Sequence, residues 1–308
     1  MNYSQRIIFM GTPLLAVPYL DSLLKEKFNI IGVYTQPPRA RGRGMKIEPS
    51  PIQVFAESNK LPLFYPSNLK EKNEFQRFKN LNSDLVVVMG YGIKLPKIFL
   101  DFPKYGCINV HLSILPKWRG ASPVEHALLN GDKETGVTIF KLNEFLDSGP
   151  ILASKKIKID AHITKNLLIE KLNKEGQKLL INILPKYFQK KINLSTQKKL
   201  NVTYAPKIKK NDSKLIFYDS AIKLSNKVRA FSPNPGAWFT FNNERIKIIN
   251  CSIEYIKGNK STIMSKDFLI GCSDFSIRPT IIQREGKNKM EIKEFLKGFK
   301  FSIGDKLN

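Results

Sequence analysis

Apolar residues recur along the first half of the chain at two different spacings, which predict strands and helices in alternation. Residues 6–10 and 85–89 are short and almost uniformly apolar, as buried strands of a parallel sheet are. Residues 14–24 carry apolar side chains three and four positions apart, which is typical of a helix packed against a sheet. Strand, helix and strand in succession predict an α/β fold with a Rossmann-like, doubly wound parallel sheet.

The same patterns predict the remaining elements. We expect further strands at 30–35, 107–112, 136–142 and 151–159, and further helices at 69–80, 124–130, 164–187 and 221–230. Thr12 is expected to cap the first helix and Pro13 to open it. Its prolines and glycines predict that segment 36–51 is a loop.

The pattern changes after residue 206. Short strands at 237–241, 245–255, 268–271 and 275–283 are separated by turn residues, and this spacing predicts a small OB-like β-barrel. The polar, basic stretch before them reads as a linker. We therefore expect three parts, residues 1–189, the linker 190–206 and residues 207–308.

Charge adds a class of partner to this picture. The 308 residues carry a formal net charge of +25. Of this, +10 lies from residue 207 onward and +15 before it, so both main parts are basic. Such an excess favours a polyanion, either nucleic acid or an anionic membrane surface. A general bias of composition towards lysine would give the same charge with no such partner.

The apolar runs, cysteines and histidines predict a cytoplasmic protein without a membrane span or a metal site. The apolar N-terminal run is interrupted by Gly11-Thr12-Pro13, so we expect no signal peptide, and no apolar run is long enough to cross a membrane. The three cysteines lack CxxC spacing, which predicts free thiols in a reducing cytoplasm. Scattered cysteines and histidines predict no metal site.

The candidate chemistry begins in the strand that starts at Cys107. Alternation points Asn109 and His111 to the same side, near the end of the strand where α/β sheets bind ligands. Asp147 follows a later apolar segment and precedes Ser-Gly. An amide that donates to an oxyanion, an imidazole that moves a proton and a carboxylate that orients it suit acyl transfer. Polar positions on an edge strand and a capped turn are the structural alternatives.

These residues belong to two motifs that carry a resemblance. Asn109-x-His111-x-Ser113-x-Leu115-Pro116 and Leu146-Asp147-Ser148-Gly149 are similar to motifs of the folate-dependent formyltransferases. The resemblance implies Asn109, His111 and Asp147 as catalytic residues and 10-formyltetrahydrofolate as co-substrate, without a metal. It places the folate beside two segments, one made of Ser113, Ile114, Leu115 and Pro116 and the other of Gly90, Tyr91 and Gly92.

The basic segment 36–51 bears on the acceptor of the formyl group. It carries Arg39, Arg41, Arg43 and Lys46, either as a solvated loop or as a basic finger that orders on an RNA backbone. The resemblance favours the finger, because tRNA-specific members of the superfamily have a basic insertion here, with a key arginine that matches Arg43. Lys207 ends a stretch that resembles their domain junction. This implies methionyl initiator tRNA as the partner of a monomeric enzyme.

Two departures and two rival functions remain open at this point. Leu15 stands where the superfamily usually has Phe, and Arg284 where it has Pro. A formyltransferase with another amine acceptor, or a formyl-folate hydrolase, could carry the same Asn-His-Asp set. A non-catalytic protein on an inactivated scaffold is the second rival, and its binding of RNA would depend on charge alone.

Overall fold

The structure of the protein is a computed structural model that describes residues 3–41 and 44–307. The chain forms two compact units, which we describe separately. Unit 1 comprises Met1–Gly120, Gly136–Ile157 and Ile169–Tyr204, and unit 2 comprises Ala121–Thr135, Lys158–Leu168 and Ala205–Asn308.

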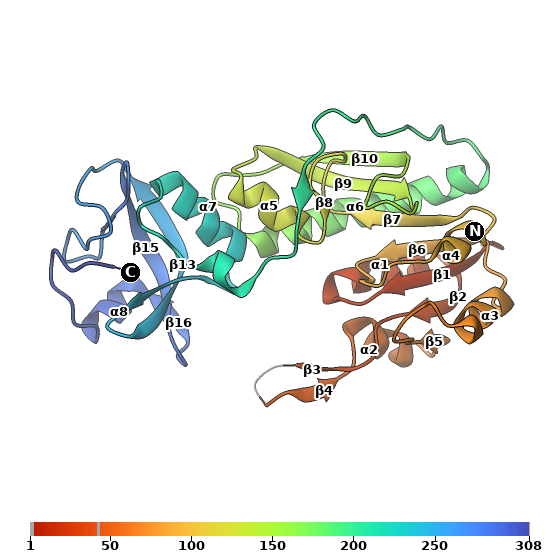
Figure 1. Cartoon of the computed structure of the whole chain (residues 1–308), viewed down its shortest axis with the longest axis horizontal. Coiled ribbons are helices and arrows are strands. Elements are labelled where there is room, and N and C mark those ends of the chain that lie inside the picture. Colours follow the sequence, from red (N-terminus) through yellow and green to blue (C-terminus); the bar gives the residue numbers. More distant parts are fainter. Residues whose placement is uncertain (1–2, 42–43, 308) are drawn as a thin grey trace. The chain divides into compact units, whose positions relative to one another are not determined.

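Unit 1 is built on a mixed sheet of seven strands in the order β10-β9-β7-β6-β1-β2-β5 (Figure 1). These are β1 (Arg6–Gly11), β2 (Asn29–Tyr34), β5 (Leu63–Phe64), β6 (Leu85–Met89), β7 (Cys107–His111), β9 (Glu134–Lys141) and β10 (Ile151–Lys158). Its helices are η1 (Leu14–Ala16), α1 (Val17–Lys25), α2 (Pro51–Ser58), α3 (Lys72–Asn80), α4 (Lys97–Asp101) and α6 (Lys165–Phe188), of which α6 begins in the part of the chain assigned to unit 2.

The centre of this sheet matches the expected parallel arrangement. Strands β5, β2, β1, β6 and β7 pair in parallel, and every residue of the central strand β6 is buried, as in a sheet that is covered on both faces. Strand β9 instead runs antiparallel to β7, so the sheet is not purely parallel. A parallel pair needs a crossover connection over the sheet. The helix between β7 and β9, α5 (Pro123–Leu129), packs in unit 2 instead.

Two local expectations are wrong. Segment 36–51 is more than a loop, because β3 (Arg39–Arg41) and β4 (Lys46–Glu48) pair as an antiparallel hairpin before α2 begins at Pro51. The hydroxyl of Thr12 does not cap a helix. It donates a hydrogen bond to the Tyr91 carbonyl at 2.8 Å, and η1 starts after Pro13 without a side-chain cap.

Unit 2 has a second, antiparallel sheet. Strands β12 (Ala237–Phe241), β13 (Glu244–Glu254), β15 (Ser276–Arg284) and β14 (Ile270–Gly271) pair in that order, and β16 (Lys289–Glu291) pairs with β15. The unit also contains η2 (Lys210–Ser213), α7 (Ala221–Phe231) and α8 (Ile292–Lys297), while the two-residue strands β8 (Arg119–Gly120) and β11 (Tyr204–Ala205) pair where the units meet along the chain. No pairing within the described residues joins β12 to β14, so this sheet is not a closed barrel.

The core of unit 2 forms where α7 packs on this sheet. Leu224, Val228 and Phe231 of α7 are buried with Ile246 and Ile248 of β13. The apolar positions of α7 are three and four residues apart, and those of β13 are two apart, so each element presents one apolar face to the other. Within the described part of the chain, none of the helices is both long enough and apolar enough to span a bilayer.

Candidate active site

Strand β7 places Asn109 and His111 where the parallel sheet meets its antiparallel edge. Asn109 lies opposite Val88 of β6 and Phe140 of β9, and His111 lies opposite Thr138. His111 is 5 % exposed, whereas Asn109 is only partly buried. Among the described residues, no group is hydrogen-bonded to the Asn109 side chain. Its amide is therefore available to a ligand, as an oxyanion donor must be.

The imidazole of His111 is oriented by a backbone carbonyl. Its Nε2 lies 2.8 Å from the Trp118 carbonyl oxygen. A carbonyl only accepts hydrogen bonds, so Nε2 bears a proton. The nitrogen that is left to gain or lose a proton is Nδ1, which lies 3.8 Å from Oδ2 of Asp147. That separation exceeds a hydrogen bond but brings the carboxylate beside the position of the imidazolium charge.

Asp147, which we expect to orient His111, accepts its hydrogen bond from a backbone N–H and not from the imidazole. The Gly120 N–H donates to Asp147 Oδ2 at 2.7 Å, and this bond fixes the carboxylate in a largely buried position. Asp147 itself has a φ of +42°, a left-handed conformation that Asp adopts more readily than most residues. The structure therefore brings Asn109, His111 and Asp147 together, and segment 118–120 is hydrogen-bonded to both His111 and Asp147.

Thr138 of β9 fixes the segment that follows His111. Its hydroxyl donates to the Ser113 carbonyl at 2.7 Å and accepts from the Leu115 N–H at 3.1 Å. Ser113 is fully buried and its hydroxyl donates to the Lys117 carbonyl at 2.6 Å. Leu115 is also buried, while Ile114 and Pro116 are partly exposed. Sequence reasoning missed Thr138, which looks like any strand threonine until β9 is placed beside β7.

The second segment expected to border a ligand, Gly90-Tyr91-Gly92, follows β6. Gly90 and Gly92 have φ values of +61° and +81°, so both require the left-handed freedom of glycine. The ring of Tyr91 is buried in the core, and this burial raises the pKa of its hydroxyl. The Tyr91 carbonyl accepts from Gln36 Nε2 at 2.8 Å, and the Gln36 amide fills the space beside Gly92. This segment therefore offers backbone groups rather than the tyrosine ring.

The structure describes some of the residues that we expect to contact tRNA. Arg39 and Lys46 are exposed on the β3–β4 hairpin, and Lys207 is exposed in unit 2. The backbone of Arg41 belongs to β3, while Arg43 lies outside the described residues.

A residue of the expected linker also reaches the site. The side chain of Gln197 is buried and donates to the carbonyl of Asp147 at 2.9 Å. Thr203 accepts from the Trp118 N–H through its hydroxyl at 2.8 Å. Thr203 begins the stretch that resembles the domain junction of the superfamily, but no sequence signal distinguishes Gln197 from the polar residues around it, so only the structure could find it.

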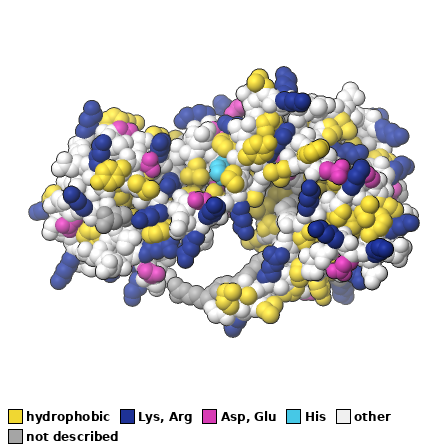
Figure 2. Space-filling view, in the orientation of Figure 1, with side chains coloured by type: hydrophobic (Ala, Val, Ile, Leu, Met, Phe, Trp, Pro, Cys, Tyr) yellow, Lys and Arg dark blue, Asp and Glu magenta, His cyan; other side chains and the backbone are white. Residues whose placement is uncertain are grey.

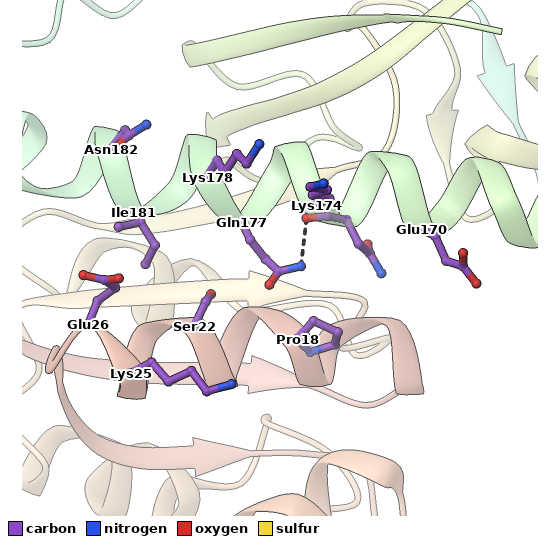
Figure 3. A pocket seen from close by; sticks show the side chains of 11 residues that line it. Pro18, Ser22, Lys25, Glu26, Glu170, Lys174, Gln177, Lys178, Ile181 and Asn182 are labelled. Atoms are coloured by element: carbon purple, nitrogen blue, oxygen red, sulfur yellow. Dashed lines mark hydrogen bonds between the residues drawn. The ribbon is translucent and has the colours of Figure 1, made fainter.

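A separate groove lies elsewhere in unit 1, between α1 and α6 (Figure 3). It has a volume of about 580 Å³ and is lined mostly by polar residues, among them Ser22, Glu170 and Gln177. None of the residues discussed above lines it, so it is not part of the candidate active site. Among the described residues, no group of three or more His, Cys, Asp and Glu side chains is arranged to hold a metal ion.

Comparison with known proteins shows the class to which this site belongs. The formyl transferase family matches residues 5–184, and the C-terminal domain of formyl transferases matches residues 207–300. The chain therefore belongs to the formyl transferase family. It is 41 % identical over 307 residues to the methionyl-tRNA formyltransferase of Rhizorhabdus wittichii, covering 98 % of each chain. It is 38 % identical to that of Pelagibacter ubique, covering 99 % of each.

Solved structures show the same fold. The N-formyltransferase of Helicobacter canadensis, in complex with folinic acid and dTDP-3-aminofucose, matches with a TM-score of 0.66 at 18 % identity, over 91 % of this chain and 99 % of that one. HypX of Aquifex aeolicus, in complex with tetrahydrofolic acid, matches with a TM-score of 0.66 at 16 % identity, over 99 % of this chain and 51 % of that one.

We predict that Cys107 is not a nucleophile, although it begins the strand that carries Asn109. It is fully buried in β7, and burial raises the pKa of its thiol. Because the thiolate is the reactive form, reactivity appears only when the pH rises through this raised pKa or when the protein unfolds. At neutral pH, iodoacetamide should leave Cys107 unmodified in the native protein, as followed by peptide mass spectrometry, and alkylate it in concentrated guanidinium. Modification of native Cys107 together with loss of activity would contradict this assignment.

Proposed function

We propose that this protein transfers a formyl group from 10-formyltetrahydrofolate to the α-amino group of methionine on initiator tRNA, which yields N-formylmethionyl-tRNA for translation initiation. The observation that carries the proposal is the convergence of Asn109, His111 and Asp147 at the end of β7, in a chain similar over its whole length to methionyl-tRNA formyltransferases.

The three residues would divide the chemistry as follows. The neutral amine attacks the formyl carbon, a C–N bond forms, and the bond from that carbon to the folate nitrogen breaks. The free amide of Asn109 donates to the oxygen that becomes negative, an interaction worth about 3–4 kcal/mol at comparable sites. His111 moves a proton from the amine to the folate nitrogen through Nδ1, and Asp147 stabilises the imidazolium at 3.8 Å.

The surroundings suit a folate as the formyl donor. Ile114 and Pro116, which are partly exposed, offer apolar surface on either side of the buried Leu115, next to the backbone that Ser113 anchors. The ends of β6 and β7 are adjacent because these strands pair in parallel, so the 90–92 segment borders the same edge of the sheet. Apolar surface beside polar backbone groups fits a flat heterocycle with a polar edge.

The acceptor side of the proposal rests on charge and on the relatives. Lys and Arg side chains are spread over the visible face of the molecule rather than gathered in one patch (Figure 2). Such a positive surface attracts the phosphates of a nucleic acid, whereas its spread does not by itself mark one binding face. We propose that Arg39, Arg41, Arg43, Lys46 and Lys207 contact the tRNA. For Arg43 the proposal rests on the sequence alone.

We propose that three parts of the chain have different roles. Residues 1–189 would form the catalytic domain on a Rossmann-like sheet, and residues 190–206 a linker. Residues 207–308 would form an OB-like platform for tRNA. We further propose that the enzyme acts in the cytoplasm, because translation initiation supplies its acceptor there. We also propose that it is a monomer.

The proposed function is tested by offering three acceptors with 10-formyltetrahydrofolate: methionyl initiator tRNA, methionyl elongator tRNA and free methionine. We expect formylation of the initiator species alone. Folate turnover without a formylated tRNA would indicate a hydrolase or another amine acceptor. Absence of turnover with every acceptor would indicate a non-catalytic RNA-binding protein.

Replacing Asp147 with Asn tests the catalytic set. The Asn carbonyl can still accept from the Gly120 N–H, so stability should change by less than about 1 kcal/mol. Loss of the negative charge beside His111 should lower kcat by about 100-fold or more. The control Asp101→Asn removes a carboxylate that pairs with Lys97 on the surface and should leave kcat unchanged. An Asp147→Asn variant with native kcat would exclude this role for Asp147.

The hairpin contacts are tested through the salt dependence of tRNA binding. Each phosphate contact contributes about 0.9 to the slope of log affinity against log salt on a duplex. Arg39→Ala combined with Lys46→Ala should weaken tRNA binding and reduce this slope by up to about 2. The matched pair Lys25→Ala and Lys97→Ala, which removes two lysines engaged with Asp21 and Asp101, should leave the slope unchanged. If the hairpin variant lost only folate affinity, the assignment to tRNA would be wrong.

A further inference from the structure

Gln197 makes four hydrogen bonds at the candidate active site. Its Nε2 donates to the carbonyls of Asp147 at 2.9 Å and Gly149 at 2.8 Å. Its Oε1 accepts from Nη2 of Arg119 at 2.7 Å and from Nε of Arg119 at 3.2 Å. The amide therefore joins the 118–120 loop to the 147–149 turn, the two segments between which the Gly120 N–H meets the Asp147 carboxylate.

The chemistry of its partners fixes the orientation of this amide. A carboxamide has two N–H donors and two lone pairs, and all four are used here. The carbonyls of Asp147 and Gly149 can only accept, and the guanidinium of Arg119 can only donate. A flipped amide would place Oε1 against the two carbonyls and the NH2 group against the guanidinium of Arg119, so a single orientation is stable. Because the side chain is 8 % exposed, water cannot readily replace these partners.

The chain on either side holds Gln197 in this place. Ser195 and Ile151 exchange two backbone hydrogen bonds, with N···O distances of 2.9 and 2.7 Å. Thr203 binds the 118–120 loop twice, as its hydroxyl accepts from the Trp118 N–H at 2.8 Å and its carbonyl accepts from the Arg119 N–H at 2.9 Å. The 195–203 segment is thus fastened beside the site before and after Gln197.

The backbone of Asp147 explains why such a contact matters. With a φ of +42°, Asp147 occupies a region that costs a non-glycine residue free energy and persists only where surrounding contacts hold it. Gln197 binds the carbonyl of this residue and that of Gly149. Gly149 is itself tightly placed, because a Cβ there would lie 1.8 Å from the Lys141 carbonyl oxygen. Loss of the amide of Gln197 would remove two of the contacts that hold this backbone conformation, so the peptide after Asp147 could rotate and pull the carboxylate away from its bond with the Gly120 N–H.

We propose that Gln197 is a positioning residue for formyl transfer, which acts by holding Asp147 beside His111. The inference rests on the proposed function and adds to it a residue outside the Asn-His-Asp set. It predicts that loss of Gln197 acts through Asp147 on the chemical step and not through the affinity for either substrate.

Two substitutions of similar size separate the bonds of Gln197. Gln197→Met removes all four bonds, and Gln197→Glu keeps an acceptor for Arg119 but places a carboxylate against two carbonyls. Each should lower kcat about 10- to 100-fold, as for residues that orient a reacting group from outside it, with KM for both substrates changed by less than about threefold. Gln189→Met, the same change at an exposed glutamine, should leave kcat within about twofold of the wild type.

A double-mutant cycle distinguishes positioning from a general structural effect. If Gln197 acts through Asp147, then Gln197→Met should lower single-turnover rates by less than about threefold in an Asp147→Asn background. Equal losses in the two backgrounds, or a native kcat in Gln197→Met, would overturn the proposal. Amide hydrogen exchange supplies a readout without activity, since exchange at 143–150 should accelerate in Gln197→Met. If the wild type formylates no amine while this exchange still accelerates, the proposed function fails and the contact of Gln197 with Asp147 stands.

Discussion

The candidate site depends on one hydrogen bond, from the Gly120 N–H to the Asp147 carboxylate at 2.7 Å. It joins the loop that orients His111 through the Trp118 carbonyl to the turn that carries the charge facing Nδ1. A hydrogen bond to an ionised carboxylate is stronger than one between neutral groups, and partial burial strengthens it further. Together with the bond from His111 to the Trp118 carbonyl, it sets how His111 and Asp147 lie, although the two side chains make no hydrogen bond to each other.

The mixed sheet makes this meeting possible. Parallel pairing of β7 with β6 brings Asn109 to the end of the sheet where α/β folds bind ligands. Antiparallel pairing of β7 with β9 then supplies Thr138, whose hydroxyl anchors the segment after His111 at Ser113 and Leu115. Strand β7 thus carries Asn109 and His111. Its neighbour β6 places it in the sheet, and its other neighbour β9 fixes the segment that follows it.

Sequence patterns located the elements better than their contacts. The apolar run at 85–89 coincides with β6, and the short strand expected at 237–241 coincides with β12, because an apolar run and the turn residues that bound it are properties of the local sequence. The hairpin of β3 and β4 was missed because three-residue strands carry too little pattern among prolines and glycines. The sequence did not predict that β9 is antiparallel, because the direction of a strand depends on the path of the connection before it. Here that connection contains α5, which packs in unit 2 and does not cross the sheet.

The sequence by itself determined the chemistry that is available: an amide and an imidazole two residues apart on a strand, an aspartate before a tight turn, and a large positive charge. Residue type and short-range spacing are local properties, so they can be read without a fold. Only the tertiary structure decided which groups meet. Gln197 reaches Asp147 from 50 positions away, and the Gly120 N–H reaches its carboxylate from 27. Contacts between such distant residues arise from packing, which no local pattern encodes.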